Sequence, residues 1–427
     1  MRLGCTCTAP GSDSPGNRSH AIVISLKFQN LSLRGPVAMP SYASFMENLP
    51  VYAFARVARK SQEVAQRDGV AVINARIGIP DKEAMPTVKR HMEEAVREAD
   101  STLGYPVDMH PERGIAALRE AIQADYKERH GVDVPDECIM VTGWSKEVLH
   151  NLPRMFRGNA VIPEPVYPAY VGAAIAAGNP IRLVPMSAEG GWLPEVKLQS
   201  DDAYMFFCDP NNPTGSVADR PYYDGLAGQL KATDTIGIFD KPYKDYVFDA
   251  SVKPLSIAQI PGMMDHGYEV VSFSKHHNFV GIGLGWLVSS PENISQFNRF
   301  YGHIWQGVPL YHQKAGLVAL TDPAARAEMK AYMDELTDRR RLFVDGLNQL
   351  GLRCDTAPAT PYLWIKVPEG RNDEDFVLET ILGRAHVAFM PGSYFGQSGS
   401  GYMRATLFLP EEKINEALGR IAAVRDW

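Results

Sequence analysis

Short apolar runs alternate with helix-like segments along the middle of the chain. The segments 85–98 and 114–126 repeat apolar residues at a helical spacing. Seven apolar runs are predicted to be strands: 138–142, 160–163, 181–185, 203–208, 236–239, 269–273 and 284–288. Short apolar strands that alternate with helices are typical of a parallel sheet that is buried on both faces. We therefore predict an α/β fold whose large domain holds a mostly parallel seven-stranded sheet.

The pattern changes after about residue 321. A long charged helix is predicted over 324–350, and a final helix begins at Glu411. Between them lie predicted strands at 362–367, 387–389 and 402–408. This order of elements is typical of an α+β domain, so we expect a second, smaller domain here.

The start of the chain differs in composition from the rest. The first 38 residues are rich in Ser, Gly, Asn and Arg, and their apolar run at 21–26 is too short and too late for a signal peptide. We predict that residues 1–38 are a disordered extension. The other predicted parts are 39–84, the N-terminal part of the smaller domain, 85–320, the large domain, and 321–427, the C-terminal smaller domain.

Composition and charge exclude several classes of protein. The 427 residues carry a formal net charge of −7, so the chain lacks the basic surface that nucleic-acid binding requires. The longest uncharged stretches, 165–181 and 276–291, fall short of the roughly 20 apolar residues that cross a bilayer, so no membrane partner is expected. The five scattered cysteines form neither a disulfide framework nor a paired zinc motif. This favours a cytoplasmic location and no metal site.

Polar side chains follow several of the predicted strands. In an open parallel sheet, ligands bind outside the carboxyl ends of the strands. One crevice could therefore collect these side chains and form a ligand site. They are Ser145, Lys146, Tyr167, Asn212, Asp240, Tyr243, Ser272, Ser274 and Lys275.

Some of these positions lie in motifs that are unspecific when taken singly. Asn212 lies in a Pro- and Gly-rich turn. Asp240 precedes Tyr243 by three residues, and Lys275 follows the next predicted strand. A turn, a carboxylate near a phenol and a strand-end lysine each occur in many proteins without a catalytic role. Their order and spacing in one chain make the combination informative.

In these motifs the chain resembles the fold type I pyridoxal-phosphate enzymes of the class I/II aminotransferase branch, and within it the LL-diaminopimelate aminotransferases. The resemblance covers nearly everything after Met39. The segments that carry it are 49–52, 104–106, 141–149, 165–168, 209–215, 240–243, 272–275, 359–364 and 391–404. It implies the fold of a pyridoxal-phosphate-dependent transferase, with pyridoxal 5'-phosphate as the cofactor and an amino acid as the substrate.

The resemblance also implies three catalytic residues. Lys275 would bind the cofactor covalently and then move the α-proton of the substrate. Asp240 would pair with the ring nitrogen of the cofactor and keep it protonated. Tyr243 would bind the ring oxygen, together with Asn212.

Other residues are implied to hold the cofactor by its phosphate and its ring face. Ser145 and Lys146 open a predicted helix and would bind the phosphate at the positive end of that helix. Ser272 would assist them, and Ser274 belongs to the same cofactor site. Tyr167 would stack on the ring.

The implied substrate site is formed by Arg404, Gly78 and Asn212. Arg404 would clasp the α-carboxylate, because a planar guanidinium fits a carboxylate with two parallel hydrogen bonds. The backbone at Gly78 would approach the same carboxylate. Tyr105 matches a tyrosine that reaches the cofactor phosphate of the neighbouring subunit, which implies a homodimer.

The chain departs from the family pattern after Lys275. Gly283 occupies the place of an arginine that binds the cofactor phosphate, eight residues after the lysine. Losing one partner of a buried charge pair costs on the order of 3 to 5 kcal/mol, so we expect a substitute cation, for which Lys146 is the candidate. His276 and His277 either pack in the core or supply an additional acid/base group beside the cofactor.

Transamination is the reaction that the resemblance favours. The cofactor spends half of that cycle without a covalent bond to Lys275, and the missing arginine weakens the remaining phosphate contacts. The alternative is therefore elimination, replacement or cyclisation at the β or γ carbon, with S-adenosylmethionine among the substrates considered, or oxidation of an amino acid. A non-catalytic ligand sensor is a third hypothesis. Such sensors carry a basic DNA-binding module, for which residues 1–38 are too short.

Overall fold

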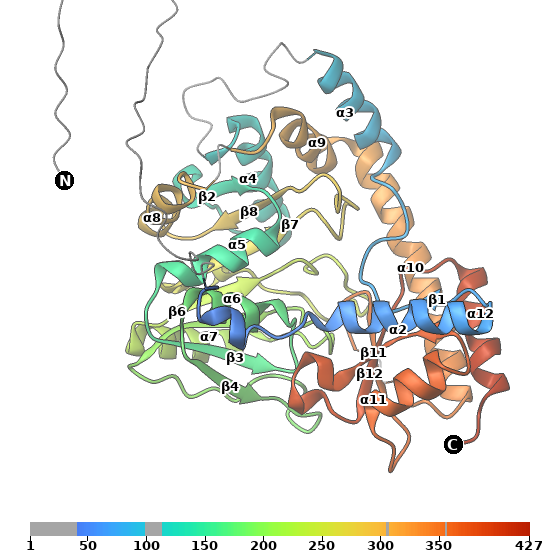
Figure 1. Ribbon diagram of the computed structural model, residues 1–427. Coiled ribbons are helices and arrows are strands. Elements are labelled where there is room, and N and C mark those ends of the chain that lie inside the picture. The colour runs from blue at the N-terminus through green and yellow to red at the C-terminus, as the bar shows by residue number, and fades with distance from the viewer. Residues whose placement is uncertain (1–40, 99–112, 305–306, 355–356) are drawn as a thin grey trace, which may run out of the picture. The chain divides into compact units, whose positions relative to one another are not determined.

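A seven-stranded sheet runs through the centre of the described chain (Figure 1). The computed structural model describes residues 41–98, 113–304, 307–354 and 357–427. The strands of the sheet are β2 (Ile139–Thr142), β3 (Asn159–Glu164), β4 (Ile181–Pro185), β5 (Asp202–Cys208), β6 (Ile236–Asp240), β7 (Gly267–Ser272) and β8 (Gly285–Val288). Their order is β2-β8-β7-β6-β5-β3-β4. β8 is antiparallel to both neighbours and the other pairings are parallel, which confirms the predicted sheet.

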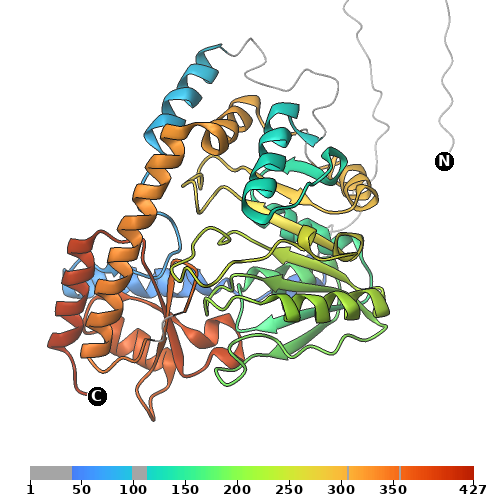
Figure 2. The same ribbon diagram turned by 180° about the vertical axis from the view of Figure 1, so that it is seen from behind.

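Helices cover both faces of this sheet, because its strands point apolar side chains to both sides. Side chains alternate along a strand, so Phe206 of β5 packs into one apolar cluster and Phe207 into another. The first cluster includes residues of α5 (Ser145–Asn151) and α6 (Ala169–Ala177). The second includes residues of α7 (Arg220–Thr233). Figures 1 and 2 show α5 and α6 on one side of the sheet and α7 on the other.

Two smaller sheets bring the beginning of the described chain next to its end. β12 (Tyr402–Thr406) pairs antiparallel with β9 (Tyr362–Lys366) and with β11 (Met390–Pro391). β1 (Ile73–Asn74) pairs parallel with β10 (Val387–Ala388). The segment that precedes the large sheet therefore packs with the segment that follows it.

Of the other helices, those at 86–98, 116–130, 323–349 and 411–423 lie where the sequence predicts them, and the rest are not assigned by the sequence analysis. Together these other helices are α1 (Phe45–Asn48), α2 (Ala53–Asp68), α3 (Pro86–Glu98), α4 (Ala116–His130), α8 (Pro291–Tyr301), α9 (Leu310–Thr321), α10 (Pro323–Gln349), α11 (Asp373–Asp375) and α12 (Glu411–Ala423). The Asp322 side chain accepts hydrogen bonds from the first backbone N–H groups of α10, which have no partner inside the helix. The sequence analysis assigns no helix to α2, whose buried stripe consists of Val57, Ser61 and Val64 alone.

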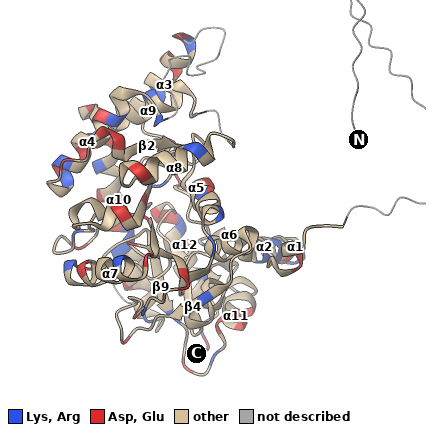
Figure 3. Ribbon diagram, turned by 90° about the vertical axis from the view of Figure 1, so that its left-hand side faces the viewer, with Lys and Arg blue, Asp and Glu red and all other residues tan. Residues whose placement is uncertain are grey.

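The described chain from Ser44 to Trp427 packs as one unit. The domain boundaries at residues 38, 84 and 320 therefore stay predictions. None of the described helices combines the length and the apolar character that crossing a membrane requires. Basic and acidic residues are interspersed along the described helices (Figure 3).

Candidate active site

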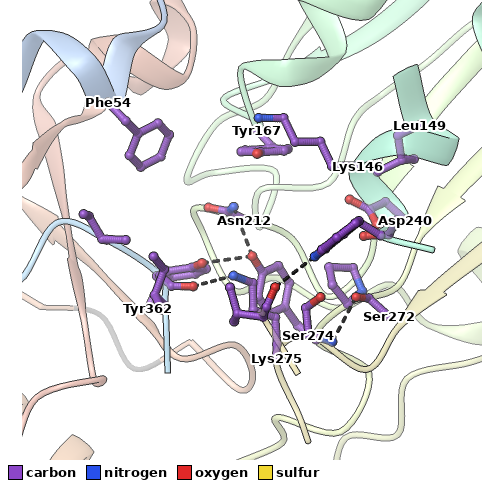
Figure 4. Close-up of a pocket in the computed structure, with 18 of the residues that line it drawn as sticks. Phe54, Lys146, Leu149, Tyr167, Asn212, Asp240, Ser272, Ser274, Lys275 and Tyr362 are labelled. Atoms are coloured by element: carbon purple, nitrogen blue, oxygen red, sulfur yellow. Dashed lines mark hydrogen bonds between the residues drawn. The ribbon is translucent and has the colours of Figure 1, made fainter. Parts of the chain in front are cut away.

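One cavity of about 400 Å³ lies where the carboxyl ends of the central strands meet the segments around β1 and β12 (Figure 4). The predicted site residues that line it are Gly78, Ser145, Lys146, Tyr167, Asn212, Asp240, Tyr243, Ser272, Ser274, Lys275 and Arg404. Tyr105, the remaining predicted residue, lies outside the described residues. The fold therefore brings together residues that are more than 300 positions apart in the sequence.

Asp240, the last residue of β6, has one carboxylate oxygen that is unused within the described chain. Its Oδ2 accepts a hydrogen bond of 2.5 Å from the Tyr170 hydroxyl, whereas its Oδ1 is buried without a partner among the described residues. Burial raises the pKa of Asp240 to about 7. A cationic N–H donor in the cavity would satisfy Oδ1 and stabilise the ionised carboxylate. The protonated ring nitrogen of pyridoxal phosphate has this chemistry, so the residue fits the cofactor.

Lys275 carries a buried amine that is poised to react. Its Nζ donates a hydrogen bond of 2.5 Å to the backbone carbonyl of Gly78. Burial, and secondly the charge of Arg404, lower the pKa of Lys275 to about 8, although Asp240 acts in the opposite direction. A lysine with a lowered pKa has a larger neutral fraction, which is the form that attacks a carbonyl group. A Cβ at residue 78 would lie 1.9 Å from the Tyr362 hydroxyl oxygen, so glycine is required for this close approach.

Hydroxyl and amide groups lie beside the lysine. The hydroxyls of Tyr243 and Tyr362 share a hydrogen bond of 2.9 Å, and the amide nitrogen of Asn212 lies 3.4 Å from the Tyr243 hydroxyl. Burial raises the pKa of Tyr243, so its hydroxyl keeps its proton and can donate it in a hydrogen bond.

Arg404 is a buried guanidinium whose charge is not neutralised by any described carboxylate. Its terminal nitrogens donate hydrogen bonds of 2.7 Å to the Asn212 side-chain oxygen and of 2.7 Å to the Arg76 carbonyl. Its Nε is buried without a partner in the described parts of the chain. The Cζ atom lies 4.0 Å from the centre of the Tyr362 ring. These neutral contacts orient the guanidinium and leave its charge available to an anion.

The end of the cavity near α5 carries hydroxyl groups and one further cation. Ser145 is the first residue of α5, and the Ser272 hydroxyl accepts a hydrogen bond of 3.1 Å from the Ser274 backbone. The Lys146 ammonium lies 4.7 Å from the centre of the Tyr52 ring. The Tyr52 hydroxyl in turn shares a hydrogen bond of 3.0 Å with the Tyr167 hydroxyl. Donors of this kind suit a phosphate group.

The indole of Trp144 fills the space beside Gly283, where the family carries an arginine. Gly283 has a φ of +68°, and a Cβ there would lie 2.4 Å from the Trp144 ring. The Trp144 indole N–H donates a hydrogen bond of 2.9 Å to the Val280 carbonyl, and its ring lines the cavity. The indole therefore occupies room that a side chain at residue 283 would need.

Replacing Gly283 by alanine is expected to lower the free energy of unfolding by about 2 to 4 kcal/mol, through left-handed backbone strain and the clash with Trp144. Gly281→Ala is the matched control, because a Cβ at residue 281 meets open space, and its effect is expected to stay within about 1 kcal/mol. Chemical denaturation of both variants measures the difference. Equal stabilities would show that the indole does not exclude a side chain at residue 283.

His276 and His277 lie away from this cavity, although they follow the lysine directly. His276 Nδ1 lies 3.4 Å from the Asp245 carboxylate and 3.3 Å from the His277 ring nitrogen. Burial lowers the pKa of His276 to about 4 and lowers that of His277 as well, so both rings stay neutral. They line another cavity, of about 450 Å³. This geometry favours the packing interpretation over an acid/base role beside the cofactor.

Several lining or supporting residues are not identified by the sequence analysis. Tyr170 lies in the first turn of α6, three residues after Tyr167, so a search for a second tyrosine close to Tyr167 would have found it. Phe54 belongs to no motif singled out in the sequence. Tyr362 lies in the segment 359–364 that carries the resemblance, but the sequence analysis assigns no role to it, and the tertiary fold brings both residues to the site.

Comparisons with known proteins agree with this geometry. The model of the family "aminotransferase class I and II" matches residues 71–421. The LL-diaminopimelate aminotransferase of Halothermothrix orenii is 34% identical over 389 residues, which cover 89% of this chain and 97% of that protein. The substrate-bound BacF structure from Bacillus subtilis is 28% identical with a TM-score of 0.83, covering 91% of this chain and 99% of that one. The aromatic aminotransferase structure from Pyrococcus horikoshii is 26% identical with a TM-score of 0.76, covering 86% and 98%.

The family match extends over most of the chain and includes all described residues of the cavity from Gly78 to Arg404. The unused oxygen of Asp240, the amine of Lys275 and the hydroxyl groups near α5 fit pyridoxal phosphate. Transamination of an amino acid is therefore the reaction, and pyridoxal phosphate is the cofactor. The chain belongs to the class I and II aminotransferase family, as a fold type I pyridoxal-phosphate-dependent transferase.

Proposed function

We propose that Lys275, Asp240 and Arg404 are the working residues of this transamination. The observation that carries the proposal is the state of Arg404, whose buried charge faces no carboxylate among the described residues of a cavity that also holds Lys275. An uncompensated buried charge is strongly unfavourable. The site is therefore complete when an anionic group binds, and the α-carboxylate of an amino acid supplies one next to the reacting amino group.

Each of the three residues acts on a different part of substrate or cofactor. Arg404 binds the α-carboxylate with parallel N–H donors. When bound, pyridoxal phosphate supplies an electron-accepting ring that stabilises negative charge on the α-carbon. Asp240 holds the proton of the ring nitrogen. Lys275, whose pKa of about 8 leaves a neutral fraction near neutral pH, takes up the α-proton and returns it.

The other predicted residues of the cavity are proposed to hold the cofactor. Tyr243 and Asn212 bind the ring oxygen, and Tyr167 packs against the ring face. Lys146 supplies a cation on the side where Gly283 has none. The groups proposed to bind the phosphate are those of Ser145, Lys146, Ser272 and Ser274.

Replacing Arg404 by alanine is expected to lower kcat/KM for amino acids by about 10²- to 10⁴-fold, because a buried charge pair with the carboxylate is lost. Arg404→Lys is the matched control: it keeps the charge but loses the planar fork, so it should recover part of the loss. Steady-state kinetics with an amino acid and with the corresponding amine measure the effect. If the parent enzyme uses the amine equally well, Arg404 does not bind a carboxylate.

We also propose that the working unit is a homodimer in which Tyr105 reaches the cofactor of the other subunit. The support is the match of Tyr105 to the family tyrosine and the exposed apolar residues near the start of α2, among them Val51 at 72% exposure and Tyr52 at 40%. We further propose a cytoplasmic location. The support is the scattered cysteines, which do not form the disulfide framework of a small secreted protein.

Mixed dimers of a Lys275→Ala chain and a Tyr105→Ala chain test the exchange of Tyr105. If Tyr105 acts across the interface, one of the two sites in each mixed dimer has both an intact lysine and an intact tyrosine. We then expect activity close to half of the parent value, after purification through two different affinity tags. If Tyr105 acts within its own chain, neither site is complete and the mixed dimer stays as inactive as the separate variants.

A further inference from the structure

The side of the cavity that faces away from Asp240 is apolar. Figure 4 shows Phe54 and Tyr362 across the cavity from Asp240 and Ser272. Ile77 and Ile79 line the same cavity. The substrate must lie on this side, because the groups that fit the cofactor are gathered on the other.

Apart from the Arg404 guanidinium, the polar group that the labelled residues of Figure 4 offer on this side is already used within the protein. The Tyr362 hydroxyl is bonded to the Tyr243 hydroxyl. What remains for a substrate is therefore carbon surface, mainly the Phe54 ring and the isoleucine side chains. Ile79 is 49% exposed, so part of this surface is open to cover by a ligand.

The apolar surface lies directly beside the guanidinium that we assign to the α-carboxylate. The Arg404 Cζ atom lies 5.3 Å from the centre of the Phe54 ring, which lines the cavity. A substrate whose carboxylate is held by Arg404 thus has apolar side chains within reach of its own side chain.

We propose that this enzyme prefers an amino acid with a large apolar side chain, aliphatic or aromatic, which packs against Phe54 and Ile79. The inference rests on the proposed function, because it uses Arg404 as the carboxylate site. Covering a leucine- or phenylalanine-sized side chain in this way strengthens binding by about 10- to 100-fold.

The substrate class that we propose differs from LL-diaminopimelate, the substrate in the name of the Halothermothrix orenii relative. Diaminopimelate carries a second ammonium and a second carboxylate at its far end. Among the described residues that line the cavity, Asp240 is the one carboxylate, and Tyr170 already donates to it. Lys146 is assigned to the cofactor phosphate, and a distal ammonium would lie against carbon and lose its hydration without a partner.

Equilibrium binding to the holoenzyme tests the inference without turnover. The probes are 3-phenylpropanoate, which is phenylalanine without its amino group, and propanoate, which is alanine without its amino group. We expect 3-phenylpropanoate to bind about 10- to 100-fold more tightly, as measured by calorimetry. Phe54→Ala should reduce this ratio by about tenfold and leave propanoate affinity unchanged within about twofold. Val70→Ala is the control, since Val70 is exposed and does not line this cavity.

Steady-state kinetics with single amino acids then distinguish a failure of the apolar preference from a failure of the proposed function. We expect kcat/KM for phenylalanine or leucine to exceed that for LL-diaminopimelate by at least about tenfold. A preference for LL-diaminopimelate, or equal affinity of the parent for both probes, would overturn the apolar preference and leave the proposed function standing. Failure of every amino acid to react would refute the proposed function, while the ratio of the two probe affinities would still decide the inference. Should Phe54→Ala lose propanoate binding as well, Ile79→Ser provides the same comparison at a more exposed position.

Discussion

Replacing Lys275 by alanine is expected to lower turnover by at least about 10³-fold, because one side chain is proposed both to bind the cofactor covalently and to carry the α-proton. The parent enzyme, reduced with borohydride and digested, should yield one cofactor-labelled peptide, and that peptide should contain residue 275. The variant should yield none. Steady-state turnover and mass spectrometry of the peptides measure both effects.

A second lysine of the same cavity provides the control for this experiment. Lys146 also lines the cavity, but its ammonium lies over the Tyr52 ring. Lys146→Ala should keep the borohydride label on Lys275 and bind the cofactor less tightly. Labelling of Lys146 in the parent enzyme, or near-normal turnover of the Lys275 variant, would contradict the assignment.

The central sheet is well predicted from the sequence because its strands are buried on both faces. Most of these strands are then largely apolar runs, and the run at β5 stands out against polar loops. α2 is different, since a narrow buried stripe on a mostly polar helix leaves little trace in the sequence. Local pattern therefore predicts the buried strands of the central sheet and misses α2.

The residues of the site also include some that the sequence predicts and some that it does not. Asp240 and Lys275 were predictable because each lies at or shortly after the carboxyl end of a strand, and these ends meet at one edge of a parallel sheet. Phe54 and Tyr362 could not be predicted to lie beside Arg404. Phe54 comes from the start of α2, and Tyr362 comes from β9, whose pairing with the Arg404 strand β12 is not set by local sequence pattern.

Gly283 shows how a structure changes the meaning of a departure from a family pattern. In the sequence, Gly283 stands where the family has an arginine, so a cation for the cofactor phosphate is lost. In the fold, a side chain at this position would meet the indole of Trp144, and the backbone is left-handed. The presence of Gly283 and the position of Trp144 therefore depend on each other. An arginine introduced at residue 283 alone would clash with Trp144 and would not contact the phosphate.

Asp240→Asn is expected to slow cleavage of the α-C–H bond by about 10²- to 10³-fold, because a neutral amide cannot stabilise the protonated ring nitrogen. Cofactor binding should change much less, since the phosphate and ring contacts remain. Exchange of the substrate α-proton with deuterated solvent, followed by mass spectrometry, isolates this step. An unchanged exchange rate would remove Asp240 from the mechanism.

The same variant should make the cofactor-free protein more stable, which separates a chemical defect from a folding defect. Burial raises the pKa of Asp240 from 3.8 to about 7, so the folded state binds more protons than the unfolded state between about pH 4 and pH 7. The parent therefore loses stability as the pH rises through this window, by an amount on the order of 4 kcal/mol. Asparagine carries no charge and still offers an oxygen to the Tyr170 hydroxyl, so the variant avoids this loss. The stability gap between variant and parent should be small at pH 4, grow up to pH 7 and stay constant above it. A variant that is both slower and more stable at pH 8 would show that the carboxylate is retained for its charge toward the cofactor and not for the stability of the fold.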